Sequence, residues 1–140
     1  MIELVALKQA LAAEQAVVYG YGVVGAHLSG KDRKYAFSQL VAHENLRDRI
    51  SALITTAGAV APPSQAAYRL PMPVTGAKSA RLLAAQLESG AAGAAWDLCA
   101  STAAQSPARE VAVGWLTNAA VAAARWGAPA ASIPGRRQAS

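Results

Sequence analysis

The chain has 140 residues, which is enough for one domain with a hydrophobic core and too few for two ordinary ones. It is 54% hydrophobic, carries a net charge of +5, and contains more alanine than any other residue; because alanine has the highest helix propensity, this composition predicts an all-α protein. The basic residues are scattered and do not follow aromatic residues along one helix, which argues against a nucleic-acid-binding groove.

The single cysteine, Cys99, rules out an internal disulfide and a thiolate metal site. The uncharged runs either contain Pro62 and Pro63 or are too short to span a bilayer, so no membrane association is expected. Glu3 interrupts the start of the chain and no basic segment precedes it, which speaks against a signal peptide. These features predict a cytoplasmic protein.

The first predicted helix runs from Ile2 to Leu28, and Ser29-Gly30 ends it. Glu14 lies in the middle of its apolar stripe, so the sequence predicts a buried carboxylate that needs a partner. Gly20, Gly22 and Gly25 are expected to let a neighbouring segment approach closely. The stripe consists of Leu4, Leu7, Leu11, Glu14, Val18, Tyr21, Gly25 and Leu28.

The second predicted helix runs from Arg33 to Ala57, with Asp32 as its N-cap. His43, Glu44 and Arg47 lie within or at the edge of its apolar face. That face is formed by Phe37, Leu40, Val41, Leu46, Ile50, Leu53 and Ile54.

Residues 58–78 contain four prolines, so they form a long connection rather than a helix. An extended segment of this length can carry the chain along a bundle to its other end. Tyr68, Leu70, Met72 and Val74 alternate with polar or proline residues, which predicts packing along the helices.

The third predicted helix, from Ser79 to Ala104, places Glu88 on an inner face rich in alanine. The fourth begins at Ser106-Pro107, presents Trp115 on its inner stripe, and ends before Gly127. Four helices with one long connection between the second and third predict a ferritin-like four-helix bundle. The bundle is expected to span residues 1–128 as a single domain, followed by a flexible tail at 129–140.

The predicted interior contains carboxylates from three helices, Glu14, Glu44 and Glu88. A two-metal site in such a bundle needs two Glu-x-x-His pairs, but Arg47 and Val113 occupy the positions of the two histidines. Arginine cannot bind a metal. We therefore expect no metal and no cofactor, and we place Arg47 between Glu14 and Glu88 as their counter-charge, so that replacing it by leucine would cost several kcal/mol.

Simpler interpretations of these residues remain open. His43 is better explained as a hydrogen-bonded histidine of the core or of an interface than as a ligand, and Glu44 is also consistent with a residue at the solvent edge of its helix. Tyr68 is also consistent with a packing residue that has a polar hydroxyl at its tip and no redox role. Trp96 lies on the outer side of the third helix, where an apolar patch would favour a homodimer.

Five segments of the chain resemble an actinobacterial ferritin-like domain family of unknown function. The segments are AAEQAVVYGYGVVGAHL, AHENLRDRISALI, AAYRLPMPVTGAKSA, LAAQLESGAAGAAWDL and VGWLTNAAVAAARW, and they cover most of the chain. The family has an E-H-A pair early in its first helix, where this chain has Glu14-Gln15. The resemblance implies a ferritin-like bundle that forms a dimer, and it implies no activity.

The sequence thus predicts a metal-free bundle that acts as a binding or interaction protein, as a homodimer with an unidentified protein or small-molecule partner. Its candidate ligand-binding or buried polar residues are Glu14, His43, Glu44, Arg47, Glu88 and Tyr68. The alternative is a divergent metal-dependent oxidoreductase that uses Glu14, Glu44, Glu88 and His43 as a reduced ligand set. A third possibility is a small-molecule pocket beneath the segment from Tyr68 to Pro73.

Overall fold

The computed structural model describes residues 2–129, and within this range it contains four helices and no strand. The helices are α1 (Ile2–Ala26), α2 (Gly30–Thr56), α3 (Ala77–Ala100) and α4 (Pro107–Arg125). The all-α prediction is confirmed. No helix in the described range is long and apolar enough to cross a membrane. The predicted flexible tail lies outside the described residues except for Pro129.

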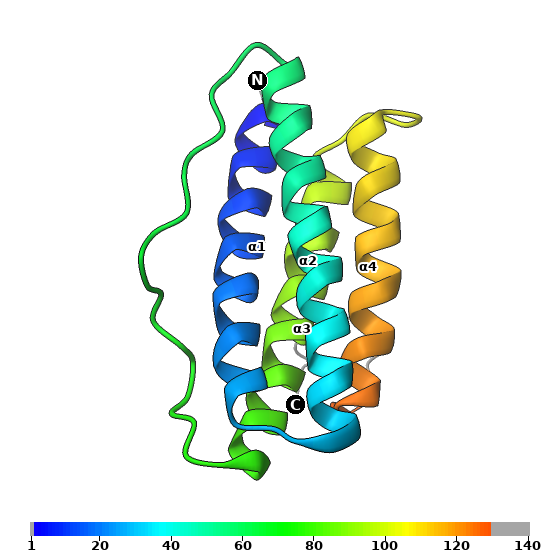
Figure 1. Ribbon diagram of the computed structural model, residues 1–140. Coiled ribbons are helices and arrows are strands. Elements are labelled where there is room, and N and C mark those ends of the chain that lie inside the picture. Colours follow the sequence, from blue (N-terminus) through cyan, green and yellow to red (C-terminus); the bar gives the residue numbers. More distant parts are fainter. Residues whose placement is uncertain (1, 130–140) are drawn as a thin grey trace.

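The four helices lie side by side, and the long connection between α2 and α3 sets their directions (Figure 1). Residues 57–76 leave the end of α2, run the length of the bundle beside α1, and enter α3 at the opposite end. As a result α2 and α3 run in the same direction, while α1 and α4 run the other way. The principal packing pairs are α3 with α4, α1 with α2, and α1 with α3.

The helix ends follow capping chemistry, with one correction to the sequence prediction. Ser106 caps α4 as predicted, because its hydroxyl accepts a hydrogen bond from the Arg109 backbone N–H and Pro107 opens the helix. Asp32 is not the N-cap of α2: the helix begins earlier, at Gly30, and Ser29 occupies the cap position. Asp32 lies in the first turn instead, where its carboxylate accepts a hydrogen bond from Arg81 at 3.4 Å.

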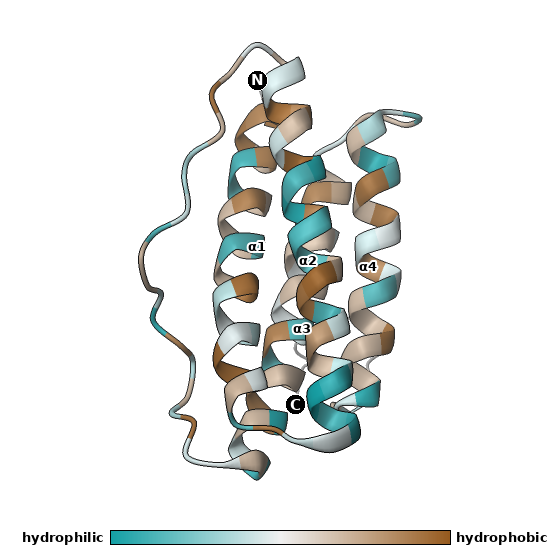
Figure 2. Cartoon of the chain, in the orientation of Figure 1, coloured by the Kyte–Doolittle hydropathy of each residue, from teal (hydrophilic) through white to brown (hydrophobic). Residues whose placement is uncertain are grey.

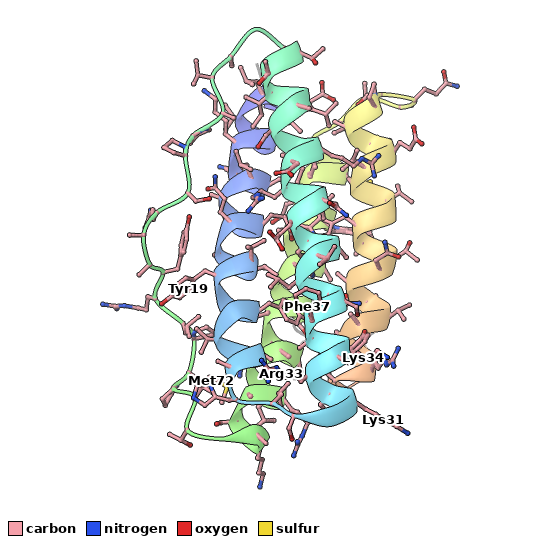
Figure 3. The ribbon with its side chains drawn as sticks, viewed as in Figure 1. Tyr19, Lys31, Arg33, Lys34, Phe37 and Met72 are labelled. Carbon is pink, nitrogen blue, oxygen red and sulfur yellow. The ribbon has the colours of Figure 1, made fainter. Side chains whose placement is uncertain are left out.

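The connecting segment is attached to α1 along its length. Leu70, Met72 and Val74 are partly buried against the core, while the residues between them are exposed. At its start, the Gln15 side chain donates a hydrogen bond to the Pro62 carbonyl at 2.8 Å. Figure 3 shows Tyr19 on the side of α1 that faces the connecting segment, the segment to which Met72 belongs.

The core is built from small side chains, and one glycine is essential to its packing. A Cβ atom at Gly20 would lie 2.6 Å from Leu87 Cδ1, so the absence of a side chain lets α1 approach α3 closely. The prediction of close approach is thus confirmed for Gly20. It is wrong for Gly22 and Gly25, where a Cβ would meet nothing within 4 Å. The contact at Gly20 places α3, and with it Glu88, against α1.

The inward face of α2 differs from the predicted one. Its buried residues are Ala36, His43, Ile50 and Ile54. Phe37 and Val41, which the prediction placed in the core, are 65% and 40% exposed. Hydrophilic residues dominate much of the visible surface of α2 (Figure 2). The buried stripe is therefore rotated around the helix, and it is centred on His43.

Candidate functional site

The centre of the bundle holds a histidine between two glutamates. Both ring nitrogens of His43 are hydrogen-bonded to carboxylate oxygens, Nδ1 to Glu14 Oε2 and Nε2 to Glu88 Oε1, each at 2.7 Å. Both carboxylates are 0% exposed and the histidine is 5% exposed. Three helices, α1, α2 and α3, each contribute one member of this Glu–His–Glu cluster. One histidine thus faces two carboxylates in the interior of the bundle.

The cluster extends through an aromatic hydrogen-bond chain. The Tyr21 hydroxyl donates to Glu88 Oε1 at 2.6 Å and accepts a hydrogen bond from Trp126 Nε1 at 3.0 Å. The Tyr21 ring also stacks on the imidazole of His43, with centroids 5.5 Å apart. Glu14 and Tyr21 are seven residues apart on α1, which puts them on one helical face. One face of α1 therefore carries both Glu14, which is hydrogen-bonded to His43, and Tyr21, which is hydrogen-bonded to Glu88.

Burial and hydrogen bonding shift the protonation equilibria of these groups. Burial alone would lower the pKa of His43, but its hydrogen bonds to Glu14 and Glu88 and the charges of both carboxylates raise the pKa to about 10. Burial raises the pKa of Glu14, and the hydrogen bond from His43 only partly offsets this. Burial and the charge of Glu88 raise the pKa of Tyr21. At neutral pH the histidine is an imidazolium and the tyrosine is a neutral donor.

Three buried polar atoms of this region have no hydrogen-bond partner among residues 2–129: Glu14 Oε1, Glu88 Oε2 and Trp115 Nε1. The indole N–H of Trp115 still lies near enough to Glu14 to lower the pKa of that carboxyl, although burial outweighs this effect. A buried carboxylate oxygen without a donor costs roughly 1–3 kcal/mol or more. The site thus contains two unpartnered acceptor oxygens and one unpartnered N–H donor.

A cleft between α2 and α4 leads to the cluster. Its volume is about 160 Å³, and Glu88, His43 and Trp115 line it together with residues of both helices. The remaining lining residues are Gln39, Ala42, Asn45, Leu46, Arg49, Val111, Gly114, Asn118 and Ala119. Glu88 is among the residues that line this cleft although its side chain is 0% exposed, so a molecule that enters meets its unpartnered oxygen only when neighbouring side chains move.

The prediction for Arg47 is wrong. Its Nε donates to Asp48 on the protein surface at 3.1 Å, and the two side chains are 28% and 70% exposed. His43 takes the position between Glu14 and Glu88 that the sequence analysis assigned to Arg47. The interpretation of His43 as a hydrogen-bonded core histidine is confirmed.

Two other predicted residues lie outside the cluster. Glu44 is half-buried and points away from the buried stripe because it is adjacent to His43 on the helix. Tyr68 lies in the connecting segment, where its hydroxyl accepts a hydrogen bond from the Gln65 backbone at 2.8 Å and its ring packs 5.7 Å from that of Tyr19. Of the six candidates, the structure brings together Glu14, His43 and Glu88.

The residues of the cluster do not suit a two-metal centre. Both nitrogens of His43 are bound to carboxylate oxygens, and an imidazolium has no lone pair to give to a metal. The ring also holds Glu14 and Glu88 on its two opposite sides. Within residues 2–129, no group of three or more His, Cys, Asp or Glu side chains is arranged to hold a metal ion. The donor set therefore fits a proton-sharing cluster.

Sequence reasoning missed three aromatic members of the site: Tyr21, Trp115 and Trp126. Tyr21 and Trp115 were predicted only as members of inward stripes, and all three residues are buried as core residues would be. Their polar atoms nevertheless point to the cluster or lie beside it. The available signal was the position of Tyr21 on the stripe of Glu14, and of Trp126 at the end of the helix whose inner stripe carries Trp115.

Comparisons with known proteins identify a family of unknown function and a solved structure of similar fold. A crystal structure of the conserved hypothetical protein rv2844 from Mycobacterium tuberculosis matches with a TM-score of 0.84 and 34% sequence identity, over 89% of this chain and 94% of that one. No curated protein matches significantly. The model of a domain of unknown function, DUF4439, matches residues 6–138. The chain belongs to the DUF4439 family.

Proposed function

We propose that this protein is a ferritin-like bundle, with a single domain over residues 1–128, that binds a small polar molecule in the cleft between α2 and α4. Four helices joined by one long connection support the ferritin-like assignment. The ring of His43 lies between Glu14 and Glu88 in the centre of the bundle, and metal-binding bundles of the ferritin-like architecture also build their sites from inward side chains of the core. The bundle thus keeps a polar centre while lacking the ligand set for a metal pair.

The observation that supports binding is the unpartnered Oε2 atom of Glu88. This oxygen is buried, belongs to a side chain that lines the cleft, and receives no hydrogen bond from the described residues. A ligand that donates a hydrogen bond here removes an energetic penalty that the free protein carries. The cleft has a volume of about 160 Å³, so we propose a ligand with few non-hydrogen atoms.

A cleft-filling variant with a matched control tests this proposal. Gly114 lines the cleft, and a Cβ added there meets nothing within 4 Å, so Gly114→Leu fills the cleft without disturbing the core. Gly90 of α3 has the same open surroundings and does not line the cleft, so Gly90→Leu makes the same change in helix propensity elsewhere. Both variants should fold.

The measurement is a screen of small polar fragments by two-dimensional NMR, which follows the three indole N–H signals of the protein. We expect fragments that shift the Trp115 signal in the wild type and in Gly90→Leu, and that leave Gly114→Leu unchanged. Fragments that shift Gly114→Leu equally would contradict binding in this cleft. Stoichiometric iron, manganese or zinc in the purified protein would contradict the proposal and favour the metal-dependent oxidoreductase.

We also propose that the chain forms a homodimer through an apolar face of α1 and α2. A groove of about 270 Å³ lies there, lined by Gly22, Gly25 and Leu40 among others, and Phe37 beside it is 65% exposed. Figure 3 shows Phe37 on the outside of α2. This face offers both a projecting ring and a groove, which suits a two-fold contact in which each copy inserts Phe37 into the other.

Light scattering of the wild type, Phe37→Ser and Trp96→Ser tests the dimer. The first substitution should give a monomer and the second should leave the dimer intact. The opposite pattern would assign the contact to the face of α3 that carries Trp96, which is 39% exposed. A wild-type monomer at high concentration would contradict the dimer.

A further inference from the structure

We infer that the groove between α1 and α2 binds a free alkyl carboxylate with a single chain, that Arg33 binds its head group, and that this ligand dissociates the dimer. The inference rests on the proposed homodimer, because it names a ligand that competes for the same groove. It follows from two glycines that no packing contact explains, from the charges beside the groove, and from the exposure of Phe37.

Two glycines of α1 keep the groove open. Gly22 and Gly25 both line it, and a Cβ atom at either position would meet nothing within 4 Å. Glycine in the interior of a helix is destabilising relative to alanine. At Gly20 the close contact with Leu87 explains the glycine, but no such contact exists at Gly22 or Gly25. A molecule that lies against the backbone of α1 does explain them, because side chains at these two positions would take its space.

The walls of the groove suit an alkyl chain. Apart from Arg33 and Tyr21, the lining residues are apolar or glycine: Gly22, Gly25, Ala26, Phe37 and Leu40. The Tyr21 hydroxyl is already hydrogen-bonded to Glu88 and Trp126. The groove has a volume of about 270 Å³, and Phe37 is 65% exposed, so a chain in the groove would remove apolar surface from water.

The positive charge beside the groove has no counter-charge in the protein. Arg33 is exposed, and no carboxylate of residues 2–129 pairs with it. Residues 15–43 supply all the lining residues, and Asp32 is the only acidic residue among them. The carboxylate of Asp32 accepts its hydrogen bond from Arg81 of α3. The guanidinium of Arg33 is therefore available to an anion from outside.

An alkyl carboxylate complements both features of the groove. A guanidinium binds a carboxylate through two parallel hydrogen bonds, so Arg33 can hold the head group while the chain lies in the groove. Lys31 and Lys34 belong to the same end of α2 and add to the positive potential there (Figure 3). Because the groove is one recess of limited volume, we assign it to a free molecule with one chain rather than to a two-chain membrane lipid.

The ligand and the second copy of the protein exclude each other. In the proposed dimer the partner's Phe37 enters the groove, and a bound alkyl chain occupies the same space. In the liganded monomer, Phe37 of the same copy packs along the chain instead. Ligand binding and dimerisation are therefore linked, and the ligand favours the monomer.

Octanoate is the probe, with 1-octanol and octylammonium as neutral and cationic molecules with the same chain. Each is titrated into the full chain at about pH 8 by calorimetry, below the concentration at which it forms micelles. We expect octanoate to bind about tenfold more tightly than 1-octanol, because it adds a charge-assisted hydrogen bond, and octylammonium to bind most weakly. Equal binding of the three molecules would overturn the role of Arg33.

Two pairs of variants locate the binding site. Arg33→Gln should lower the affinity for octanoate about tenfold, whereas Lys34→Gln removes a charge outside the lining of the groove and should lower it less than about threefold. Gly22→Leu fills the groove and should abolish binding, while Gly90→Leu makes the same change on α3 and should preserve it. Octanoate binding that survives in Gly22→Leu would overturn the inference. So would sedimentation with anionic phospholipid vesicles in the absence of octanoate binding.

Light scattering separates a failure of this inference from a failure of the proposed dimer. We expect saturating octanoate to convert the wild-type dimer to a monomer, and octylammonium at the same concentration to leave the dimer intact. A dimer that octanoate does not dissociate would overturn the competition and leave the dimer standing. A wild type that is monomeric without any ligand would overturn the dimer, and calorimetry with Gly22→Leu would then decide whether the groove binds octanoate.

Discussion

His43 and Arg47 lie one turn apart on α2, and both can carry a positive charge, yet they occupy different environments. His43 is 5% exposed and bridges two buried carboxylates, whereas Arg47 pairs with Asp48 at the surface. His43 lies at the centre of the buried stripe formed by Ala36, Ile50 and Ile54, and Arg47 lies on its flank. Position on the helical face, rather than strength of the base, decides which cation neutralises the core.

The largest expected difference between these two residues is in stability. His43→Leu leaves Glu14 and Glu88 facing each other without a cation, so we expect a loss of about 3–5 kcal/mol in the free energy of unfolding. Arg47→Leu removes only a surface ion pair and should cost less than about 1 kcal/mol. Urea unfolding of both variants measures this. Similar losses in the two variants would mean that Arg47, too, interacts with the buried carboxylates.

The pH dependence of stability sharpens the comparison. The pKa of His43 is raised from 6.5 to about 10 in the folded protein, so its stabilising effect is complete below pH 6.5 and is lost as the pH rises through 10. The raised pKa of Glu14 acts in the same direction above its ordinary value of 4.5. We therefore expect the free energy of unfolding to fall between pH 6.5 and 10 by a few kcal/mol.

His43→Gln should abolish the part of this slope that lies between pH 6.5 and 10, while Arg47→Gln should preserve it. The free energy of unfolding from urea titrations at each pH gives the slope. A wild-type stability that rises over this range would show that the imidazolium is not favoured by folding.

A smaller effect is expected at the aromatic edge of the cluster. Tyr21→Phe removes the hydroxyl that donates to Glu88 and accepts from Trp126, leaving one donor unpaired, and should cost about 1–3 kcal/mol. Tyr19→Phe is the control, because the ring of Tyr19 packs against Tyr68 far from the cluster. Equal unfolding temperatures of the two variants would show that the Tyr21 hydroxyl does not contribute to the hydrogen-bond chain.

The smallest expected effects are changes of opposite sign in the free energy of unfolding when two glycines of α1 are replaced by alanine. Gly22→Ala gains helix propensity in open space and should stabilise the protein by up to about 1 kcal/mol. Gly20→Ala forces Leu87, the neighbour of Glu88, to move and should destabilise it by about 1 kcal/mol. Equal stabilisation by both would show that α1 and α3 are less closely packed than the structure indicates.

Part of this site was predictable from periodicity. Glu14 and Glu88 lie in stripes whose other members are clearly apolar, so their burial follows from the sequence alone. On α2 the same reasoning failed, because the exposed residues Phe37 and Val41 shifted the inferred stripe away from its centre at His43. That shift made Arg47 look like the inward cation. The local sequence does not show whether an apolar residue of a helix is buried or exposed.

The hydrogen-bond chain through Tyr21 and Trp126 depends on how distant helices pack. These residues are far apart in the sequence, and their polar atoms meet only once α1 and α4 are placed around α3. The cleft between α2 and α4 arises in the same way, from two helices that contact each other only lightly. Such features require tertiary structure.

The protonation state of His43 is the most direct test of the account. Nitrogen-15 NMR of the imidazole ring at about pH 8, assigned with His43→Gln, reports whether each ring nitrogen carries a proton. The account predicts protons on both Nδ1 and Nε2, because each nitrogen donates to a buried carboxylate. A neutral ring with one unprotonated nitrogen at this pH would contradict it. That nitrogen would then have a lone pair with which to bind a metal ion.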